Sequence, residues 1–209
     1  MEKEMALFPL NLVAFPGELL NLHIFEPRYK QLVGDCIQTK TTFGIPSFAL
    51  NTIEFGTEVK ITDLTKVYDD GRMDIKTQAV RVFKVVEYQN PWESKLYAGG
   101  VVELLQFGDD KDFNLHEEIV DLIQDLFRWL KQENSIDLNY DMSMYQVIHK
   151  IGLKLDEEYA LLAMESEKQR QIYVHEHLSR LIPMLERAEQ AKEKIKLNGH
   201  FKHLDPLKF

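Results

Sequence analysis

The stretch LFPLNLVAFPGELLNLHIFEPRY, residues 7–29, combines two extended apolar segments, a tight turn and the start of a helix. Pro9 interrupts the first segment, which is typical of an edge or bulged strand because proline cannot donate to a sheet ladder. Residues 15–18, Phe-Pro-Gly-Glu, have the composition of a turn,. Pro27 suits the first position of a helix, where its missing N–H costs nothing. The stretch therefore predicts strand, turn, strand and helix in succession, and Phe8, Leu10, Leu22, Ile24 and Phe25 are expected in the core.

The helix that follows has one apolar stripe. Its members recur at helical spacing and are Tyr29, Leu32, Val33, Cys36 and Ile37,. Cys36 is therefore predicted to be a buried core thiol. Because it is the only cysteine of the chain, an internal disulfide and a multi-thiolate metal site are excluded,. Glu26, which precedes Pro27, is expected to cap the helix or to pair with Arg28.

The first half of the chain has the texture of a β-structure. Eight of the ten glycines and five of the seven prolines lie in residues 1–108, and these residues punctuate strands and turns,. Beyond the opening stretch, strands are predicted over residues 43–50, 58–67, 73–86 and 97–105, with a hairpin turn at 69–72. About six short strands with one embedded helix predict a closed or nearly closed barrel over residues 1–105.

The second half changes to a helical period, and no proline occurs between Trp92 and Ile182. Helix starts are predicted from four capping signals, at Asn114, Ser143, Asp156 and Ser166,. Pro183 is expected to kink or break the last helix. Its charged end, residues 186–196, is interpreted as a solvated helix end in preference to a contact with another chain, and residues 197–209 show no clear period. The fold class is thus α+β, with a β-barrel over 1–105 and a helical subdomain over 106–209.

The charge argues against a nucleic-acid partner. The 209 residues carry 25 Lys and Arg and 34 Asp and Glu, a net charge of −9, and neither half has a basic run,. The sequence contains no stretch of about 18 apolar residues, so no transmembrane helix is predicted. The N-terminus lacks the basic and apolar regions of a secretory signal, so a cytoplasmic protein without a membrane association is expected.

The sequence lacks the common catalytic signatures. The sequence has no Gly-rich phosphate-binding loop of either common type and no Gly-x-Ser-x-Gly elbow,. His175 and His177 lie two residues apart on a predicted helix, so they point in nearly opposite directions and cannot chelate one ion. We therefore expect no catalytic residue, no metal site and no cofactor, and a protein that is not an enzyme.

The opening stretch resembles the N-terminal substrate-recognition domain of Lon-type proteases. The specific features are the Leu-Phe-Pro-Leu strand at residues 7–10, the Phe-Pro-Gly turn at 15–17 and His-Ile-Phe-Glu-Pro-Arg-Tyr at 23–29. Weaker similarities follow at 55–57, at 70–73 and at Arg81. The resemblance implies a PUA-like β-barrel followed by a helical subdomain. It also implies a module that binds protein segments, here without the ATPase and protease domains that normally follow it.

Two functions are consistent with this resemblance. The first is a non-catalytic module that binds peptides or unfolded polypeptide segments, with a protease or chaperone as a possible partner. Aromatic residues in turn-rich segments are the candidates for its binding site: Phe48, Tyr68, Trp92 and Tyr97. The alternative is a PUA-like RNA-binding module, which the acidic charge disfavours.

Overall fold

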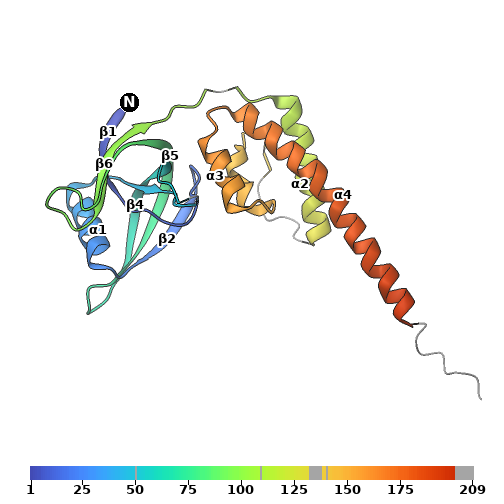
Figure 1. Cartoon of the computed structure of the whole chain (residues 1–209), viewed down its shortest axis with the longest axis horizontal. Coiled ribbons are helices and arrows are strands. Elements are labelled where there is room, and N and C mark those ends of the chain that lie inside the picture. Colours follow the sequence, from blue (N-terminus) through green and yellow to red (C-terminus); the bar gives the residue numbers. More distant parts are fainter. Residues whose placement is uncertain (50, 109, 132–137, 140, 201–209) are drawn as a thin grey trace, which may run out of the picture. The chain divides into compact units, whose positions relative to one another are not determined.

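A computed structural model describes residues 1–49, 51–108, 110–131, 138–139 and 141–200, with the backbone alone for residues 197–200 (Figure 1). Its elements in chain order are β1 (Glu2–Leu7), β2 (Leu19–Ile24), α1 (Pro27–Thr39), β3 (Phe43–Pro46), β4 (Phe55–Val67), β5 (Met73–Gln89), β6 (Ala98–Leu104), α2 (Phe113–Leu130), the 3₁₀ turns η1 (Met144–Gln146) and η2 (Ile148–Lys150), α3 (Leu155–Ala163) and α4 (Glu167–His200). None of the helices in this described part has the length and apolarity needed to cross a membrane.

The six strands form one sheet that closes on itself. Its order is β2-β5-β4-β3-β1-β6, and an additional pairing between β5 and β6 completes a ring of five strands, to which β2 is attached through β5. The long strands β4 and β5 bend around the barrel with three register shifts in their pairing, and such bulges add local twist,. The predicted α+β fold, with a six-stranded sheet that closes into a barrel and a helical part after it, is confirmed.

Helix α1 packs against the barrel and contributes to its core. Its apolar stripe buries Tyr29, Leu32, Val33 and Cys36 in one cluster with inward residues of the strands, as its spacing predicts. Ile37, the last residue of the predicted stripe, is instead 41% exposed. Cys36 is 4% exposed, which confirms it as a core residue, and this burial raises the pKa of its thiol. Phe25 is an exception to the predicted core, because 59% of it is exposed. The strand ends at Ile24, which points inward, so the next residue points out,.

The chain divides into two compact units, residues 1–111 with 141–170 and residues 112–140 with 171–209. This division differs from a boundary at residue 105, because residues 141–170 pack within the unit that contains the barrel. The ring of Tyr145 stacks on Phe15 with 5.1 Å between centroids, and the Tyr159 hydroxyl accepts a hydrogen bond of 3.2 Å from the backbone of Phe55.

His149 lies in the same region, at the surface as its polar neighbours suggest, and is held there by two carboxylates. Its Nε2 lies 3.3 Å from Glu18 and its Nδ1 lies 2.8 Å from Glu158, while the ring packs 4.8 Å from that of Phe15. The two carboxylates raise the pKa of His149 to about 9, despite partial burial. Glu18 is 131 positions away in the sequence, so local patterns give no sign of it.

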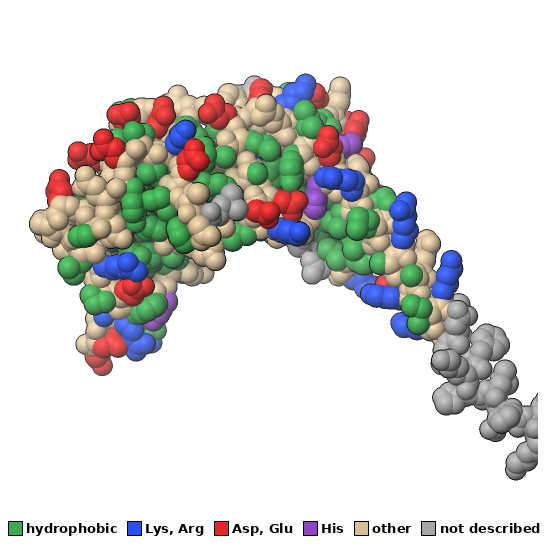
Figure 2. Space-filling view, in the orientation of Figure 1, with side chains coloured by type: hydrophobic (Ala, Val, Ile, Leu, Met, Phe, Trp, Pro, Cys, Tyr) green, Lys and Arg blue, Asp and Glu red, His purple; other side chains and the backbone are tan. Residues whose placement is uncertain are grey.

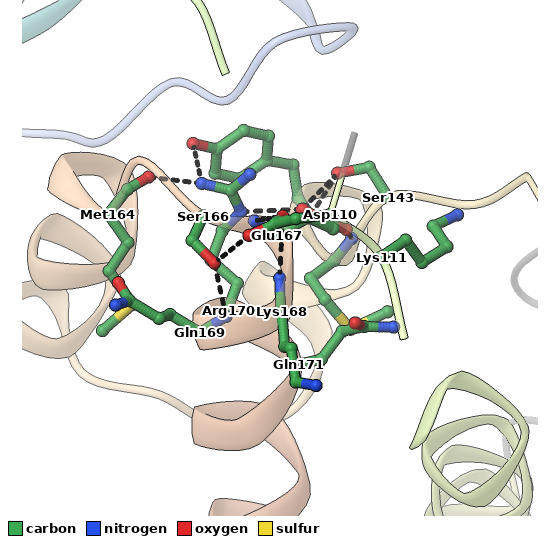
Figure 3. A network of polar contacts seen from close by, with 12 residues as sticks. Asp110, Lys111, Ser143, Met164, Ser166, Glu167, Lys168, Gln169, Arg170 and Gln171 are labelled. Carbon is green, nitrogen blue, oxygen red and sulfur yellow. Dashed lines mark hydrogen bonds and ion pairs between the residues drawn. The ribbon is translucent and has the colours of Figure 1, made fainter. Parts of the chain in front are cut away.

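The start of α4 is anchored in this unit by a buried polar network (Figure 3). The guanidinium of Arg170 packs against the rings of Phe107 and Tyr145 and also donates to the backbone carbonyl of Met164. Glu167 accepts a bond of 2.7 Å from the backbone of Met144. The network therefore joins three separate segments of the chain.

The helix caps are only partly those expected. Ser166 accepts a bond of 3.0 Å from Gln169 and caps α4 as predicted. The cap of α2 is Asp112 instead of Asn114, since its carboxylate accepts from the Leu115 N–H. Helix α3 begins at Leu155, before the Asp156 cap that was expected. The segment after Ser143 forms two 3₁₀ turns and not an α-helix.

The second unit consists of α2 and most of α4, which lie side by side (Figure 1). Ile119, Ile123 and Leu126 are buried on one face of α2, and Val174 and Leu178 are buried on α4. Helix α4 continues through Pro183, so of the expected kink or break the break does not occur. The carbonyl that loses its partner belongs to Ser179, which is exposed to water and can be solvated,. The helix also includes residues 197–200, whereas residues 201–209 lie outside the described part.

Candidate functional site

A pocket of about 230 Å³ lies where the opening stretch of the sequence meets the ends of three barrel strands. Its walls are formed by aromatic, amide and small side chains, namely Pro9, Asn11, Arg28, Tyr29, Phe48, Tyr88, Asn90 and Ala98. We call this the Phe48 pocket. Four of its eight residues belong to residues 7–29, so the opening stretch of the sequence supplies half of the pocket.

Backbone pairing places Phe48 at the rim. After β1, the Leu10 N–H donates to the Pro46 carbonyl at 3.1 Å, and the Phe48 N–H donates to the Leu10 carbonyl at 2.8 Å. These bonds continue the parallel pairing of β1 with β3 beyond the ends of the strands. Phe48 is held at a defined position while 44% of it stays exposed. A fixed and half-exposed aromatic ring is suited to contact a ligand, because little order has to be gained on binding.

The first turn of α1 supplies the inner wall. The Tyr29 ring stacks on Phe8 with 3.7 Å between centroids, which fixes its orientation. The guanidinium of Arg28 lies 4.5 Å above the Tyr29 ring, and its Nη2 lies 2.8 Å from a carboxylate oxygen of Glu26. The expected pairing of Glu26 with Arg28 is therefore present. It neutralises the charge of Arg28, so the pocket does not select strongly for an anion.

The end of β5 supplies the opposite wall with Tyr88 and Asn90. Burial raises the pKa of Tyr88, and burial likewise raises the pKa of Tyr29. Both phenols therefore keep their protons at neutral pH and act as neutral hydrogen-bond donors or acceptors. The Asn11 and Asn90 amides add further polar groups. The result is a neutral hollow with aromatic walls and a few polar groups, which is the usual composition of a binding site.

The size of the Phe48 pocket limits what it can hold. Pockets for complete small-molecule ligands are usually about 300–1,000 Å³. At about 230 Å³, this pocket suits one apolar or aromatic side chain of a longer ligand. Its lining offers no nucleophile with an adjacent base,. In the described ranges, no three His, Cys, Asp or Glu side chains are placed to hold a metal ion.

The four aromatic residues expected to form a site are not brought together. Phe48 is the member that lines the Phe48 pocket. Tyr68 lies at the β4–β5 hairpin, where its hydroxyl donates to Asp74 at 2.8 Å and its ring faces Lys66 and Arg72. Tyr68 thus belongs to a polar cluster of its own.

Trp92 and Tyr97 belong mainly to the barrel. Tyr97 is 3% exposed and its hydroxyl donates to Asp35 at 2.8 Å, so its ring is not available to a ligand. Trp92 packs partly against the core, and its indole lies so close to Gly99 that a Cβ there would overlap it. Both residues therefore cover the barrel.

Sequence reasoning missed Tyr88, Asn90 and Asn11 as pocket residues. A tyrosine and an amide just before Pro91 were the available signal, since polar residues at a strand end often face a site,. Their meeting with Arg28 depends on the closure of β5 onto β6, which no local pattern shows.

On the face shown in Figure 2, acidic and basic side chains are interspersed over the barrel, while Lys and Arg gather along the outer part of α4. The basic side chains of that part are Arg180, Arg187, Lys192, Lys194 and Lys196. They alternate with Glu186, Glu189 and Glu193, so even this segment carries mixed charge.

Comparison with known proteins agrees with the observed fold. The family described as the ATP-dependent protease La (LON) substrate-binding domain matches residues 4–180. The fold is similar to that of a Lon N-terminal domain protein from Xanthomonas campestris, with a TM-score of 0.63 and 24% identity over 87% of this chain and 98% of that chain. It is also similar to the N-terminal domain of the Mycobacterium avium complex Lon protease, with a TM-score of 0.66 and 12% identity over 85% of this chain and 98% of that chain. No curated protein matches the chain.

Proposed function

Because this chain belongs to the family of Lon substrate-binding domains, we propose that it is a non-catalytic module that recognises segments of other polypeptides. The observation that carries the proposal is the Phe48 pocket. Half of its lining residues come from residues 7–29, and it is neutral, aromatic and of side-chain size. Such a pocket captures an apolar side chain, and apolar side chains are accessible when a polypeptide is unfolded.

The proposal predicts weak and broad selectivity. One apolar side chain that anchors a ligand contributes about 2 kcal/mol or somewhat more to the binding free energy, as a dominant interface residue typically does. The neutral pocket adds no strong charge selection, since Arg28 is paired with Glu26. A module of this kind binds many unfolded chains with micromolar affinity and discriminates against folded ones. A protease or chaperone that acts on the captured segment is the kind of partner such a module would serve.

The test uses fluorescein-labelled, reduced and carboxymethylated α-lactalbumin as an unfolded probe, with binding followed by fluorescence anisotropy. We expect saturable binding at micromolar concentration, and a loss of roughly tenfold in Phe48→Ala, which corresponds to about 1.4 kcal/mol. The matched control is Met184→Ala, which removes an exposed apolar side chain from α4 and should change nothing. Absence of binding by folded wild-type protein at high micromolar concentration would reject the proposal.

RNA binding, the alternative function, stays a prediction. The cation of the Phe48 pocket is already engaged by a carboxylate, which leaves little for a phosphate backbone,. The same anisotropy assay with a labelled single-stranded RNA in place of the protein probe distinguishes the two functions. An affinity that falls steeply with salt would favour RNA.

A further inference from the structure

Strand β2 has one neighbour in the sheet, whereas each of the other five strands in the described part of the chain has at least two. It pairs with β5 from Leu19 opposite Gln78 to Ile24 opposite Met73, without a register shift. Its second edge is therefore straight and six residues long. An edge of this kind is a template onto which another strand can pair.

The pattern of hydrogen bonds shows which backbone groups face the open edge. The Ala79 N–H donates to the Glu18 carbonyl at 2.8 Å, immediately before the β2 ladder. In an antiparallel pair, bonded and non-bonded positions alternate. The residues bonded to β5 are then Leu20, Leu22 and Ile24, and those whose N–H and C=O groups point outward are Leu19, Asn21 and His23. The open edge thus presents three donors and three acceptors.

The edge lacks the usual devices that block pairing. Its sequence, LLNLHI, contains no proline and no lysine, arginine or acidic residue. Natural sheets commonly protect an edge with such residues or with a bulge. At its two ends stand Leu19, which is 70% exposed, and Phe25 just beyond the strand. An exposed apolar residue at each end favours contact with another chain over contact with water.

A hollow of about 340 Å³ lies over the sheet face that carries Asn21 and His23. It is lined by residues of β2, β4 and β5, namely Asn21, Leu22, His23, Thr65, Asp74, Ile75 and Lys76. The Asp74 carboxylate is engaged by His23 at 2.6 Å and by Tyr68 at 2.8 Å. For the ammonium group of Lys76, the described residues provide no acidic partner. On a chain of net charge −9, the hollow therefore offers a cation to an incoming carboxylate.

We propose that β2 is the docking edge for an extended polypeptide segment, which adds as a seventh strand beside Leu19–Ile24 and places an acidic side chain near Lys76. This inference rests on the proposed function and specifies how a segment would be held. Backbone bonds to the edge are independent of sequence, which suits a module that binds many chains. The apolar ends and Lys76 select segments in which an acidic residue lies between apolar ones.

The first experiment tests whether an outward-facing N–H group of β2 is needed for peptide binding. Asn21→Pro removes a donor that faces the open edge and leaves the bonds to β5 in place, and Asn21→Ala is its matched control. The probe is a fluorescein-labelled ten-residue peptide in which valine and threonine alternate around one central glutamate. We expect Asn21→Ala to bind within about twofold of wild type and Asn21→Pro to lose roughly tenfold or more, one hydrogen bond together with the clash of the ring.

A second experiment keeps the protein unchanged, in case Asn21→Pro does not fold. Two versions of the peptide are N-methylated, one at odd and one at even positions, because only alternate N–H groups of an added strand face β2. We expect one version to lose binding and the other to keep it.

A third experiment tests the role of charge. Lys76→Glu should weaken binding of the glutamate peptide about fivefold and strengthen binding of the matched lysine peptide.

Equal binding by Asn21→Pro and Asn21→Ala, or by both methylated peptides, overturns docking at β2. The proposed function survives that result if carboxymethylated α-lactalbumin still binds and Phe48→Ala still weakens it. Failure of wild-type protein to bind α-lactalbumin rejects the proposed function itself. A dimer in light scattering that Asn21→Pro converts to a monomer, without any peptide binding, assigns the edge to a second copy and also overturns the proposal.

Discussion

Arg170 donates from Nε to a carboxylate oxygen of Glu167 at 2.8 Å, with both side chains almost wholly buried in the first turn of α4. A buried charge is tolerated only when it is paired and hydrogen-bonded. Here the pair is completed by the Tyr145 hydroxyl, which accepts from Arg170 at 3.0 Å. Burial raises the pKa of Tyr145 to about 12, so this hydroxyl keeps its proton under all ordinary conditions.

Removing one partner of this pair should be far more damaging than removing both. Glu167→Ala leaves the Arg170 charge buried without its carboxylate, and we expect a loss of about 3–5 kcal/mol in the free energy of unfolding. The double variant Glu167→Ala with Arg170→Met should recover part of that loss. Urea unfolding of the two single variants, the double variant and wild type measures the coupling. A double variant that is less stable than either single variant would contradict this account.

Glu58 predicts a dependence of stability on acidic pH. Its side chain is 1% exposed in the barrel and is bound by Lys3 at 2.7 Å, Thr42 at 2.6 Å and Arg81 at 2.6 Å. Burial alone would raise the pKa of Glu58, but these three donors outweigh it and lower the pKa below its ordinary value. A lowered folded-state pKa means that the stabilisation is present above the unfolded-state pKa, about 4.3, and is lost as the pH falls below it.

We therefore expect Glu58→Gln to cost about 2 kcal/mol at pH 7, typical of a hydrogen bond to a charged group. The difference from wild type should shrink as the pH is lowered from 5 toward 3, because wild-type Glu58 becomes protonated. Chemical unfolding at several pH values in this range measures it. Glu54→Gln, at an exposed ion pair with Lys84, is the control,. A gap that is constant with pH would show that shape alone matters at position 58.

His149 predicts the opposite dependence at alkaline pH. Its folded-state pKa of about 9 is raised mainly by the hydrogen bonds to Glu18 and Glu158. A raised folded-state pKa gives stability that is full below the unfolded-state pKa, about 6.5, and is lost as the pH rises through 9. His149→Gln should therefore destabilise the protein most at pH 6 and least at pH 9.5. Urea midpoints at these two pH values, with His175→Gln as a control in the other unit, provide the measurement.

Gly99 should be intolerant of any side chain. A Cβ at this position would overlap the indole of Trp92, which also packs 6.4 Å from the ring of Tyr97. We expect Gly99→Ala to cost about 1–3 kcal/mol, as overpacking usually does, and to push Trp92 toward water. In a Trp129→Phe background, the fluorescence emission of Trp92 should shift to longer wavelength. Gly108→Ala, where a Cβ meets open space, is the control; an unshifted spectrum for Gly99→Ala would show that the ring keeps its place.

The opening stretch was predictable because its signals are local. Pro27 begins a helix, the alternation in residues 19–24 defines a strand, and Cys36 falls on the buried stripe. What the sequence could not show depends on distant segments. Phe48 meets Tyr88 only because the sheet closes, and Asp35, 62 positions before Tyr97, holds the hydroxyl of that buried residue.

The exposed position of Phe25 shows the same limit on a smaller scale. Both Ile24 and Phe25 were expected inside, yet neighbouring residues of an extended chain point to opposite faces, and Ile24 takes the inward one,. Strand ends are the least certain feature of a sequence pattern, and a shift by one residue reverses the side of every following side chain.

The first unit is not continuous in the sequence, since residues 112–140 separate its two parts. A ribosome releases the chain from the N-terminus, at about 5–20 residues per second. The barrel strands therefore emerge before Tyr145, whose ring packs on Phe15, and before His149, which binds Glu18. For the several seconds that translation of residues 112–170 takes, the nascent barrel exposes an apolar face that the finished protein hides. During synthesis this side of the barrel therefore exposes apolar side chains, as an unfolded chain does, and chaperones at the ribosome exit can bind it.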